Sequence, residues 1–209
     1  MFFIMLIFIK FNFFLKINMV KENTLVVIKP DGVKRSITGE IISRFEKVGL
    51  KVIALKMVHI DEEQAGMHYI EDIDWMKTMG EKAKIGYEKR GETFDKDPLE
   101  HGKMIRRQLM EYMSMDPVIA MVLEGHNAVK QVRKMVGSTD PCSSAPGTIR
   151  GDYSFETFSM ADQFERPIQN LIHASGEVEE AEREIKVWFK PEEISSWDRV
   201  DEALLYRKG

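Results

Sequence analysis

The sequence predicts an α/β fold in which a small antiparallel sheet carries helices on one face. Residues 24–29 and 118–123 are short, nearly continuous apolar runs, which are typical of buried strands. Residues 50–60 place apolar side chains among lysines and a histidine, as a strand with one exposed face does. Segments with helical spacing follow these strands. With 209 residues, the chain suits one domain, or a domain that carries an insertion.

The composition excludes several classes of protein. A net charge of −4 gives no support for nucleic-acid binding, which favours a basic surplus, although a local basic pocket for a small anion stays open. Cys142 is the only cysteine, so no intrachain disulfide can form, and this fits a reducing compartment. No cysteine cluster or paired-histidine motif indicates a structural metal site. We therefore expect a cytoplasmic protein with no nucleic-acid partner.

The first 18 residues differ in composition from the rest of the chain. They are almost entirely Phe, Ile, Leu, Lys, Asn and Met, and polar residues interrupt the run at Lys10, Asn12 and Lys16. The run falls short of the ~20 apolar residues of a spanning helix, and it lacks the basic start and cleavage site of a signal peptide. We expect residues 1–19 to be an atypical leader upstream of a true start at Met19, with the domain at 20–209. A membrane anchor in residues 1–18 is the alternative.

The first strand leads to a candidate functional residue. Residues 24–29 end at the turn formed by residues 30–32, which places Lys29 at a strand end. A solvated surface lysine is the alternative interpretation. Residues 41–48 repeat apolar side chains on one helical face, and Gly49 closes that helix.

The middle of the chain gives a weaker pattern. Residues 62–69 and 104–113 have helical spacing. Between them, residues 72–99 are charged, punctuated by glycines and poor in apolar residues. This composition predicts an inserted excursion of helices and loop.

The second clear strand, 118–123, leads to a helix and then a long loop. Residues 127–136 form an amphipathic pattern that bears Arg133, and Gly137 is a plausible C-cap. An exposed helix residue is the alternative interpretation of Arg133. Residues 138–153 are dense in Gly, Pro, Ser and Thr and contain Thr139 and Arg150. A loop of this length is usually functional or disordered.

A histidine near the end of the chain follows a short apolar run. Residues 171–172 predict a strand end that delivers His173 to the rim of the sheet. We expect Ser175 to cap the next helix, which packs through Val178, Ala181 and Ile185. Histidine in such a place can act as a nucleophile, base or ligand, and a surface histidine in a loop is the alternative.

Several basic and polar residues fall at the ends of predicted elements. Lys29, Arg133, Arg150 and Thr139 together suit a di- or triphosphate, whose charge is matched by guanidinium forks and point ammoniums. The chain has no glycine-rich loop followed by Lys-Ser/Thr, and it lacks a protein-kinase glycine-rich loop. If the protein transfers phosphate, His173 is the natural carrier.

Five segments, in order, resemble the nucleoside diphosphate kinase family. They are IKPDGV at 28–33, HY at 68–69, PVIAMVLEG at 117–125, PGTIRGD at 146–152 and NLIHAS at 170–175. The resemblance covers the chain from about residue 23 to its end. It implies a ferredoxin-like α/β sandwich and a ping-pong reaction, in which His173 takes the γ-phosphate of a nucleoside triphosphate such as ATP and passes it to a nucleoside diphosphate such as GDP.

The resemblance also implies roles for further residues. Asn170, with Lys29, Arg133, Thr139 and Arg150, matches the family's phosphate and sugar contacts. Tyr69 matches a tyrosine near the phosphoryl path, and Ser175 and Glu184 match residues that orient and support the histidine. Mg²⁺ would arrive on the nucleotide, with no metal ligand expected from the protein. Family members are usually hexamers or tetramers, so a homo-oligomer is implied.

The sequence departs from the family pattern in three places. Gly176 replaces the usual aspartate after the motif serine, and we expect activity to survive this change. Residues 71–108 are longer than in short members, and the phenylalanine that usually stacks on the base has no clear counterpart, so we assign no base-stacking residue. Residues 154–169 are extended as well.

Three functions are compatible with this resemblance. The first is an active phosphotransferase, the second a nucleotide-binding or scaffold protein with little turnover, and the third a protein that hands phosphate from histidine to another protein. A protein that only binds nucleotides would not need His173. The nucleophile and the cations together therefore favour the enzyme.

Overall fold

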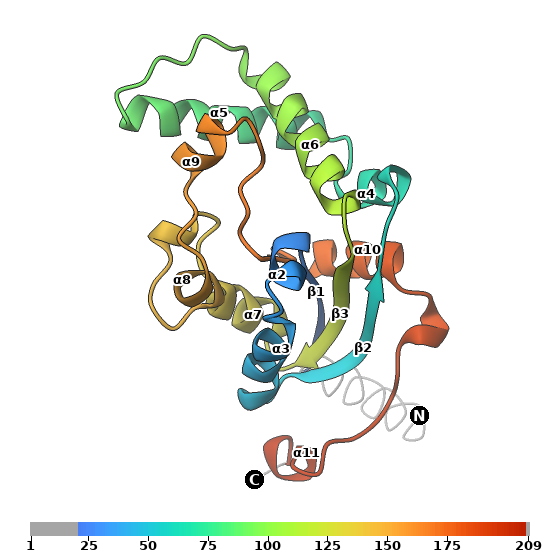
Figure 1. Cartoon of the computed structure of the whole chain (residues 1–209). Coiled ribbons are helices and arrows are strands. Elements are labelled where there is room, and N and C mark those ends of the chain that lie inside the picture. The colour runs from blue at the N-terminus through green and yellow to red at the C-terminus, as the bar shows by residue number, and fades with distance from the viewer. Residues whose placement is uncertain (1–20, 208–209) are drawn as a thin grey trace, which may run out of the picture.

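The computed structural model describes residues 21–207 and centres on a four-stranded antiparallel sheet. The leader and the start site at Met19 lie outside the described residues. The strand order is β2-β3-β1-β4, in which β1 (Glu22–Ile28) pairs with β3 (Val118–Gly125) and β4 (Ile172–Ala174), and β2 (Lys51–Val58) forms one edge. This sheet with its packed helices confirms the predicted α/β class (Figure 1).

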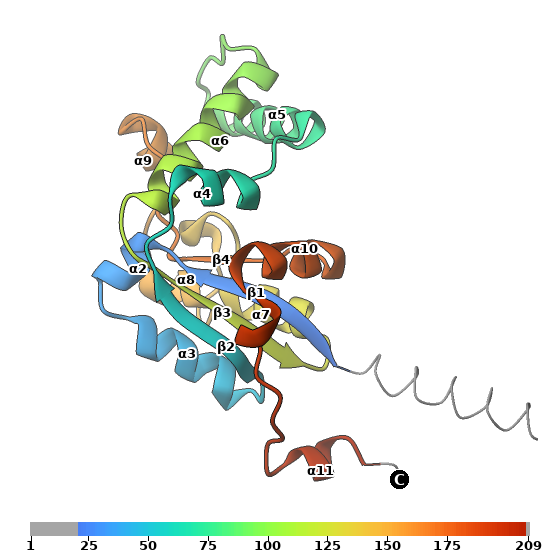
Figure 2. The same ribbon diagram turned by 90° about the vertical axis from the view of Figure 1, so that its right-hand side faces the viewer.

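Helices cover both faces of the sheet, so the expectation of helices on one face was wrong. In β1, Val26 and Ile28 belong to one apolar core, while Leu25 and Val27 belong to another. Successive strand residues point to opposite faces, and a strand that is apolar at every position must therefore be covered twice. Figure 2 shows α3 (Thr38–Lys47) and α10 (Val178–Trp188) on opposite sides of the sheet.

The remaining helices are shared between these two layers and an outer region. The core of Val26 and Ile28 also takes side chains from α3, α7 and α8, and the core of Leu25 and Val27 takes side chains from α4, α6 and α10. The bounds are α2 (Pro30–Lys34), α4 (Glu62–His68), α5 (Ile73–Lys89), α6 (Pro98–Ser114), α7 (Ala128–Val136), α8 (Ile149–Tyr153), α9 (Phe158–Gln163) and α11 (Glu202–Leu205), with single 3₁₀ turns at Pro141–Ser143 and Pro191–Glu193.

The predicted excursion forms a helical hairpin of α5 and α6. Gly80 and Gly102 allow the two helices to approach closely, because a Cβ on Gly80 would lie 1.8 Å from the carbonyl oxygen of Pro98. At Gly102, the same atom would lie 1.9 Å from the carbonyl oxygen of Met76. No side chain fits at these distances, so both glycines are required by packing rather than by flexibility. Figure 1 shows the hairpin standing away from the sheet.

The long loop at 138–153 is more regular than expected. Its last residues form α8, and the side chain of Thr148 caps that helix by accepting a hydrogen bond from the backbone N–H of Gly151 at 3.1 Å. The extension at 154–169 contains the short helix α9. None of the helices among residues 21–207 is both long and apolar enough to cross a membrane.

Candidate active site

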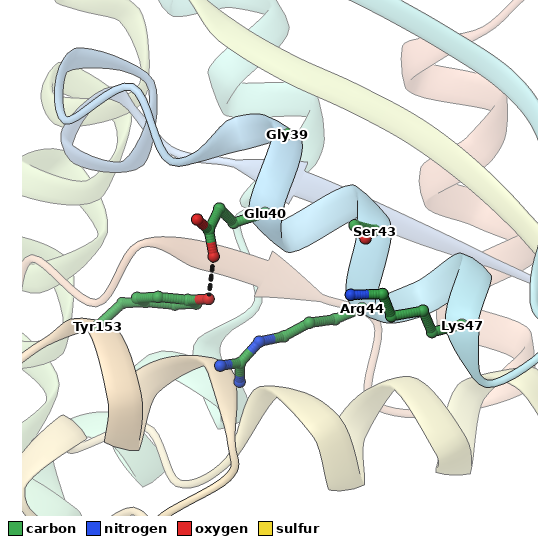
Figure 3. Close-up of a pocket in the computed structure, with 6 residues that line it drawn as sticks. All are labelled: Gly39, Glu40, Ser43, Arg44, Lys47 and Tyr153. Carbon is green, nitrogen blue, oxygen red and sulfur yellow. Dashed lines mark hydrogen bonds between the residues drawn. The ribbon is translucent and has the colours of Figure 1, made fainter.

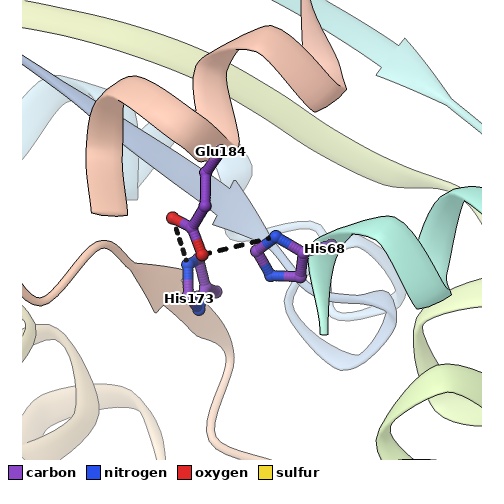
Figure 4. Close-up of side chains that lie close together, drawn as sticks. All are labelled: His68, His173 and Glu184. Atoms are coloured by element: carbon purple, nitrogen blue, oxygen red, sulfur yellow. Dashed lines mark hydrogen bonds and ion pairs between the residues drawn. The ribbon is translucent and has the colours of Figure 1, made fainter. Parts of the chain in front are cut away.

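His173 lies in the middle of the edge strand β4. It pairs with Val27 of β1, and its side chain is 18% exposed. The strand extends one residue beyond the predicted end, so His173 occupies the rim of the sheet but not the last position of the strand. Its ring points toward α10, where Nε2 lies 3.0 Å from Oε2 of Glu184 (Figure 4).

Glu184 is a buried carboxylate that faces several hydrogen-bonding groups. The Ser175 hydroxyl donates to Oε2 at 2.6 Å, and Arg183 Nη2 lies 3.7 Å from Oε1. Burial alone would raise the pKa of Glu184, but the neighbouring His173, His68 and Ser175 lower that pKa to about 2. At neutral pH the carboxylate is therefore ionised and can only accept hydrogen bonds.

This charge state fixes the proton on His173. Because Glu184 only accepts, the 3.0 Å contact requires a proton on Nε2 of His173. In a neutral imidazole the other nitrogen, Nδ1, then carries a lone pair. The carboxylate thus orients the ring and leaves the lone pair on Nδ1.

Ser175 does not cap the following helix, contrary to the expectation. The N-cap of α10 is Glu177, and it makes no side-chain capping bond. The helix starts two residues too late for Ser175 to cap it, and the Ser175 hydroxyl, which is fully buried, instead donates to the ionised carboxylate of Glu184. At Gly176, the backbone N–H donates to the carboxylate of Glu180, which supplies a negative group at the helix start.

The packed face of α10 follows the expectation in part. Ala181 is buried and Ile185 packs against the core, whereas Val178 is 37% exposed. The buried stripe also includes Glu184 and Trp188, and the place of Glu184 in this stripe brings its carboxylate to His173.

His68 is a neighbour of His173 that sequence reasoning did not assign to the site. The two rings meet edge to face with centroids 4.4 Å apart, and His68 is almost fully buried. Its Nδ1 accepts a hydrogen bond from Trp188 Nε1 at 3.2 Å, which places its proton on Nε2. Burial, together with the neighbouring His173, lowers the pKa of His68 well below its usual value, so this ring is neutral. The only signal in the sequence was its place beside Tyr69 in the HY motif.

Tyr69 continues this cluster at the end of α4. Its ring meets that of His68 with centroids 4.6 Å apart, and burial raises the pKa of its hydroxyl. Its backbone carbonyl accepts a hydrogen bond from Arg106 Nε at 2.7 Å. The phenol therefore remains protonated at neutral pH and can donate a hydrogen bond to an anion.

Lys29 is joined by a hydrogen bond to Asn170, three residues before the histidine. The ammonium of Lys29 donates to Oδ1 of Asn170 at 2.8 Å, and Nδ2 of Asn170 donates to the carbonyl of Thr139 at 2.7 Å. Burial, with a further contribution from the charge of Arg150, lowers the pKa of Lys29 to about 8. Thr139 is exposed, so its hydroxyl is accessible to a ligand.

Arg150 braces the backbone around the histidine. It is 4% exposed, and its guanidinium donates to the carbonyls of Asn170 at 3.0 Å and Ile172 at 2.7 Å. Nη1 donates to Gly137 and Ser138 at 3.2 and 2.9 Å. Four of five N–H donors are thus used, which leaves one on Nη2 for a ligand. Burial, together with nearby Arg133, lowers the pKa of Arg150 to about 10.

Arg133 is exposed, in contrast to Arg150. It lies on α7 and makes one long hydrogen bond, 3.5 Å from Nη1 to the carbonyl of Ala174, next to the histidine. Most of its donors are therefore accessible. The structure brings all nine residues singled out from the sequence to one place, namely His173, Ser175, Glu184, Tyr69, Lys29, Arg133, Thr139, Arg150 and Asn170.

His68, His173 and Glu184 bring three potential metal ligands together. One ligand atom from each residue lies within 4.8 Å of the others. Mg²⁺ prefers oxygen ligands, whereas two of these atoms are imidazole nitrogens, and the carboxylate already accepts from His173 and Ser175. These residues do not fit Mg²⁺. The cations Lys29, Arg133 and Arg150 contact the backbone on either side of His173 in the chain, and they favour phosphate and disfavour a metal ion.

A polar cavity separate from these residues lies between α3 and α8. It has a volume of about 450 Å³ and contains none of the nine residues (Figure 3). Two of its charged groups are paired with neighbours, since Arg44 bonds to Asp152 at 2.5 Å and Glu40 accepts from the Tyr153 hydroxyl at 2.8 Å.

Comparisons with known proteins point to one family. The family model described as nucleoside diphosphate kinase matches residues 22–77 and 97–194. A nucleoside diphosphate kinase of Pyrobaculum aerophilum is 46% identical over 178 residues, 83% of this chain and 97% of the relative. A crystal structure of an NDP kinase from that organism covers 84% of this chain and 100% of its own, with a TM-score of 0.82 and 44% identity. A structure from Borrelia burgdorferi, a transition-state mimic with bound vanadate and ADP, has a TM-score of 0.74 and 36% identity, and covers 90% of this chain and 99% of its own.

Proposed function

The chain belongs to the nucleoside diphosphate kinase family, and from this premise we propose that His173 carries the phosphoryl group between two nucleotides. The activity is that of a nucleoside diphosphate kinase, which is a phosphotransferase. The observation that carries the proposal is the contact of His173 Nε2 with ionised Glu184, because it leaves the lone pair on Nδ1. A protein that only binds nucleotides would not need this arrangement.

The reaction proceeds in two half-reactions at one site. In the first, Nδ1 of His173 attacks the γ-phosphorus of a nucleoside triphosphate. A P–N bond forms, the bond from phosphorus to the β,γ-bridging oxygen breaks, and the nucleoside diphosphate leaves with the electron pair on that oxygen. In the second, a different nucleoside diphosphate attacks the pros-phosphohistidine and restores the free imidazole. Dividing the transfer in this way lets one set of contacts serve donor and acceptor in turn.

The cations neutralise the charge of the phosphates. Arg133 is exposed and offers guanidinium donors, while Lys29 and Arg150 are buried and act over short distances in a low-dielectric environment. Asn170 and Thr139 add neutral contacts to phosphate and sugar. Since phosphoryl transfer depends on positioning and charge, these groups supply most of the catalysis.

Three further residues act around the imidazole. Glu184 holds the proton on Nε2 and stabilises positive charge on the ring, and Ser175 orients the carboxylate. The protonated phenol of Tyr69 donates to the phosphoryl group in transit. We assign no base-stacking residue.

The nucleotide brings its metal ion. Members of the family generally use a divalent metal with the nucleotide, and we propose Mg²⁺, held by the phosphate oxygens and not by this chain. Its partners would be nucleoside tri- and diphosphates such as ATP, GTP and GDP. We also propose a cytoplasmic location, which the single cysteine supports.

A homo-oligomer, a hexamer or tetramer, is part of the proposal. The edge strand β2 supports it, because Leu55 and Met57 on this strand are 48% and 61% exposed. An exposed apolar edge strand is a common site of chain pairing. We further propose that residues 20–209 form one domain with an insertion at about 71–108, a range that α5 and α6 occupy and in which the family match is interrupted.

A labelling experiment tests the proposed function. Brief mixing with γ-labelled ATP is expected to give an acid-labile, alkali-stable label, and added GDP is expected to remove it as labelled GTP. His173→Gln should prevent labelling while nucleotide binding remains, because the cations are intact. Folded protein that takes no label, or a His173→Gln variant that still turns over, would contradict the proposal.

A further inference from the structure

The helical hairpin is attached to the active site from the side of Tyr69. Arg106 on α6 donates to the carbonyl of Tyr69 at 2.7 Å, and the hydroxyl of Tyr112 accepts from the backbone N–H of Asp31 at 3.3 Å. Asp31 in turn accepts from the backbone N–H of Leu171, two residues before His173, at 2.9 Å. The position of the hairpin is therefore linked to the residues around the nucleophile.

Residues 154–169, here named the bridge segment, are attached to the other side of the site. The segment starts directly after α8, which carries Arg150, and it ends directly before Asn170. Glu156 and Arg166 form a two-point ion pair at 2.6 and 3.2 Å, which closes the segment on itself. The carbonyl of Glu156 also accepts from the backbone N–H of Cys142 at 3.2 Å, in the loop that follows Thr139.

The bridge segment and the hairpin meet at one polar joint. Arg90 at the end of α5 donates through Nη2 to Asp162 of α9 at 2.7 Å, and Gln108 of α6 donates to the carbonyl of Glu165 at 3.1 Å. The side chains of Arg90 and Asp162 are 23% and 30% exposed, so solvent reaches this pair. Figure 1 shows α9 beside α5, with the chain running from it toward α8.

These contacts join the hairpin, which holds Tyr69, to the bridge segment, which connects α8 and its Arg150 to Asn170. A nucleotide whose phosphates contact both Tyr69 and Arg150 would therefore lie between the hairpin and the bridge segment. We propose that the bridge segment is a clasp that holds a bound nucleotide in place, and that Arg90 and Asp162 are positioning residues that keep it closed. This inference rests on the proposed function, since it assumes that the nucleotide reaches His173.

Steady-state kinetics on single variants test the clasp. Arg90→Ala and Asp162→Ala are expected to raise KM about fivefold for donor and acceptor nucleotides alike, the size typical of a partly exposed ion pair. The dissociation rate of a fluorescent ADP analogue should rise by the same factor. Turnover at saturation should stay within about twofold, because neither residue touches the phosphates or His173.

Rescue and matched controls distinguish positioning from loss of structure. Arg90 also donates to Glu92 at 2.8 Å, so the charge exchange Arg90→Asp/Asp162→Arg is made together with Glu92→Gln to avoid two facing carboxylates. Arg90→Lys and this charge exchange should return KM toward the original value. Arg107 is the matched control, because it is another hairpin arginine in an ion pair, at 3.8 Å from Glu111. It is 71% exposed, and among the described residues it has no contact with the bridge segment. Arg107→Ala should leave KM unchanged.

Each outcome has a defined meaning. Unchanged KM in both alanine variants, an equal rise in Arg107→Ala, or a charge exchange that fails to rescue KM would overturn the clasp. If an alanine variant does not fold, Arg90→Lys and the charge exchange decide by the same KM criterion. Labelling of His173 at saturating ATP should persist in every folded variant. Failure of labelling in the unsubstituted protein would contradict the proposed function instead, so the two failures are distinguishable.

Discussion

Two sets of residues around His173, here called the carboxylate side and the cationic side, differ in charge and in burial. On the carboxylate side, Nε2 contacts the ionised Glu184 and the ring contacts neutral His68, both almost fully buried. The cationic side consists of Arg133 on α7, Arg150 on α8 and Lys29 at the end of β1, of which Arg133 is exposed. The difference teaches that orientation and charge neutralisation are supplied by separate groups. Substitutions can therefore remove the function of one set of residues while the other set stays intact.

The largest effect is expected on the cationic side. Arg150→Ala removes both a charge and the brace that holds four backbone carbonyls, so we expect kcat/KM to fall by about 10²–10³. Arg133→Ala removes an exposed charge only and should cost about tenfold without a change in melting temperature. Steady-state kinetics with thermal melts measures both. Equal effects of the two substitutions on stability would contradict the distinction between brace and charge.

The carboxylate side is tested by Glu184→Gln. The amide keeps the shape but loses the charge that holds the proton on Nε2, so the nucleophilic tautomer is less populated. We expect kcat to fall by about 10² while KM changes little, because the phosphate contacts are intact. Steady-state kinetics with varied nucleotide separates the two parameters. A rise in KM with unchanged kcat would place Glu184 in binding and not in orientation.

The pH profile sharpens the comparison through Lys29. Its pKa in the free protein is lowered to about 8, so above that pH the ammonium loses its proton and its charge. The quantity kcat/KM reports the free enzyme and is expected to fall up to about tenfold per pH unit above pH 8. Lys29→Gln should be less active and should lack this alkaline fall. If kcat/KM of Lys29→Gln still falls above pH 8, the titration belongs to another group.

The smallest effect is on stability in acid. The pKa of Glu184 is about 2 in the folded protein against 4.5 for an ordinary glutamate, so the folded state favours the ionised form. This stabilisation is fully present above pH 4.5 and is lost as the pH falls toward 2, with about 2 kcal/mol lost between pH 7 and pH 3. Urea unfolding at the two pH values measures it. Glu184→Gln should reduce the difference, and an equal difference in that variant would be contrary to this account.

Much of the fold was readable because its signals are local. The buried strands at 24–29 and 118–123 and the amphipathic helix at 127–136 all exist with small shifts at their ends. The number of covered faces was missed, although Leu25 to Ile28 is apolar at every position and that pattern itself indicates two buried faces. The burial of Glu184 on α10 was not predicted from the spacing, because a charged residue is not expected on the packed face of a helix.

The candidate site was predictable in membership but not in geometry. The sequence pointed to nine residues that lie near one another in the structure, yet it could not show that Arg150 uses four donors on backbone carbonyls or that Ser175 bonds to Glu184 and not to the helix start. These arrangements depend on contacts between segments far apart in the chain. The same holds for the joint between Arg90 and Asp162, which are 72 positions apart.

The position of phosphate on the histidine ring tests the central claim most directly. Protein phosphorylated with ATP and labelled with ¹⁵N in its histidines can be examined by ³¹P and ¹H–¹⁵N NMR at alkaline pH, where the phosphohistidine persists. Because Glu184 holds the proton on Nε2, we predict a single species with phosphorus on Nδ1 of His173. Phosphorus on Nε2, or on another residue, would contradict the account.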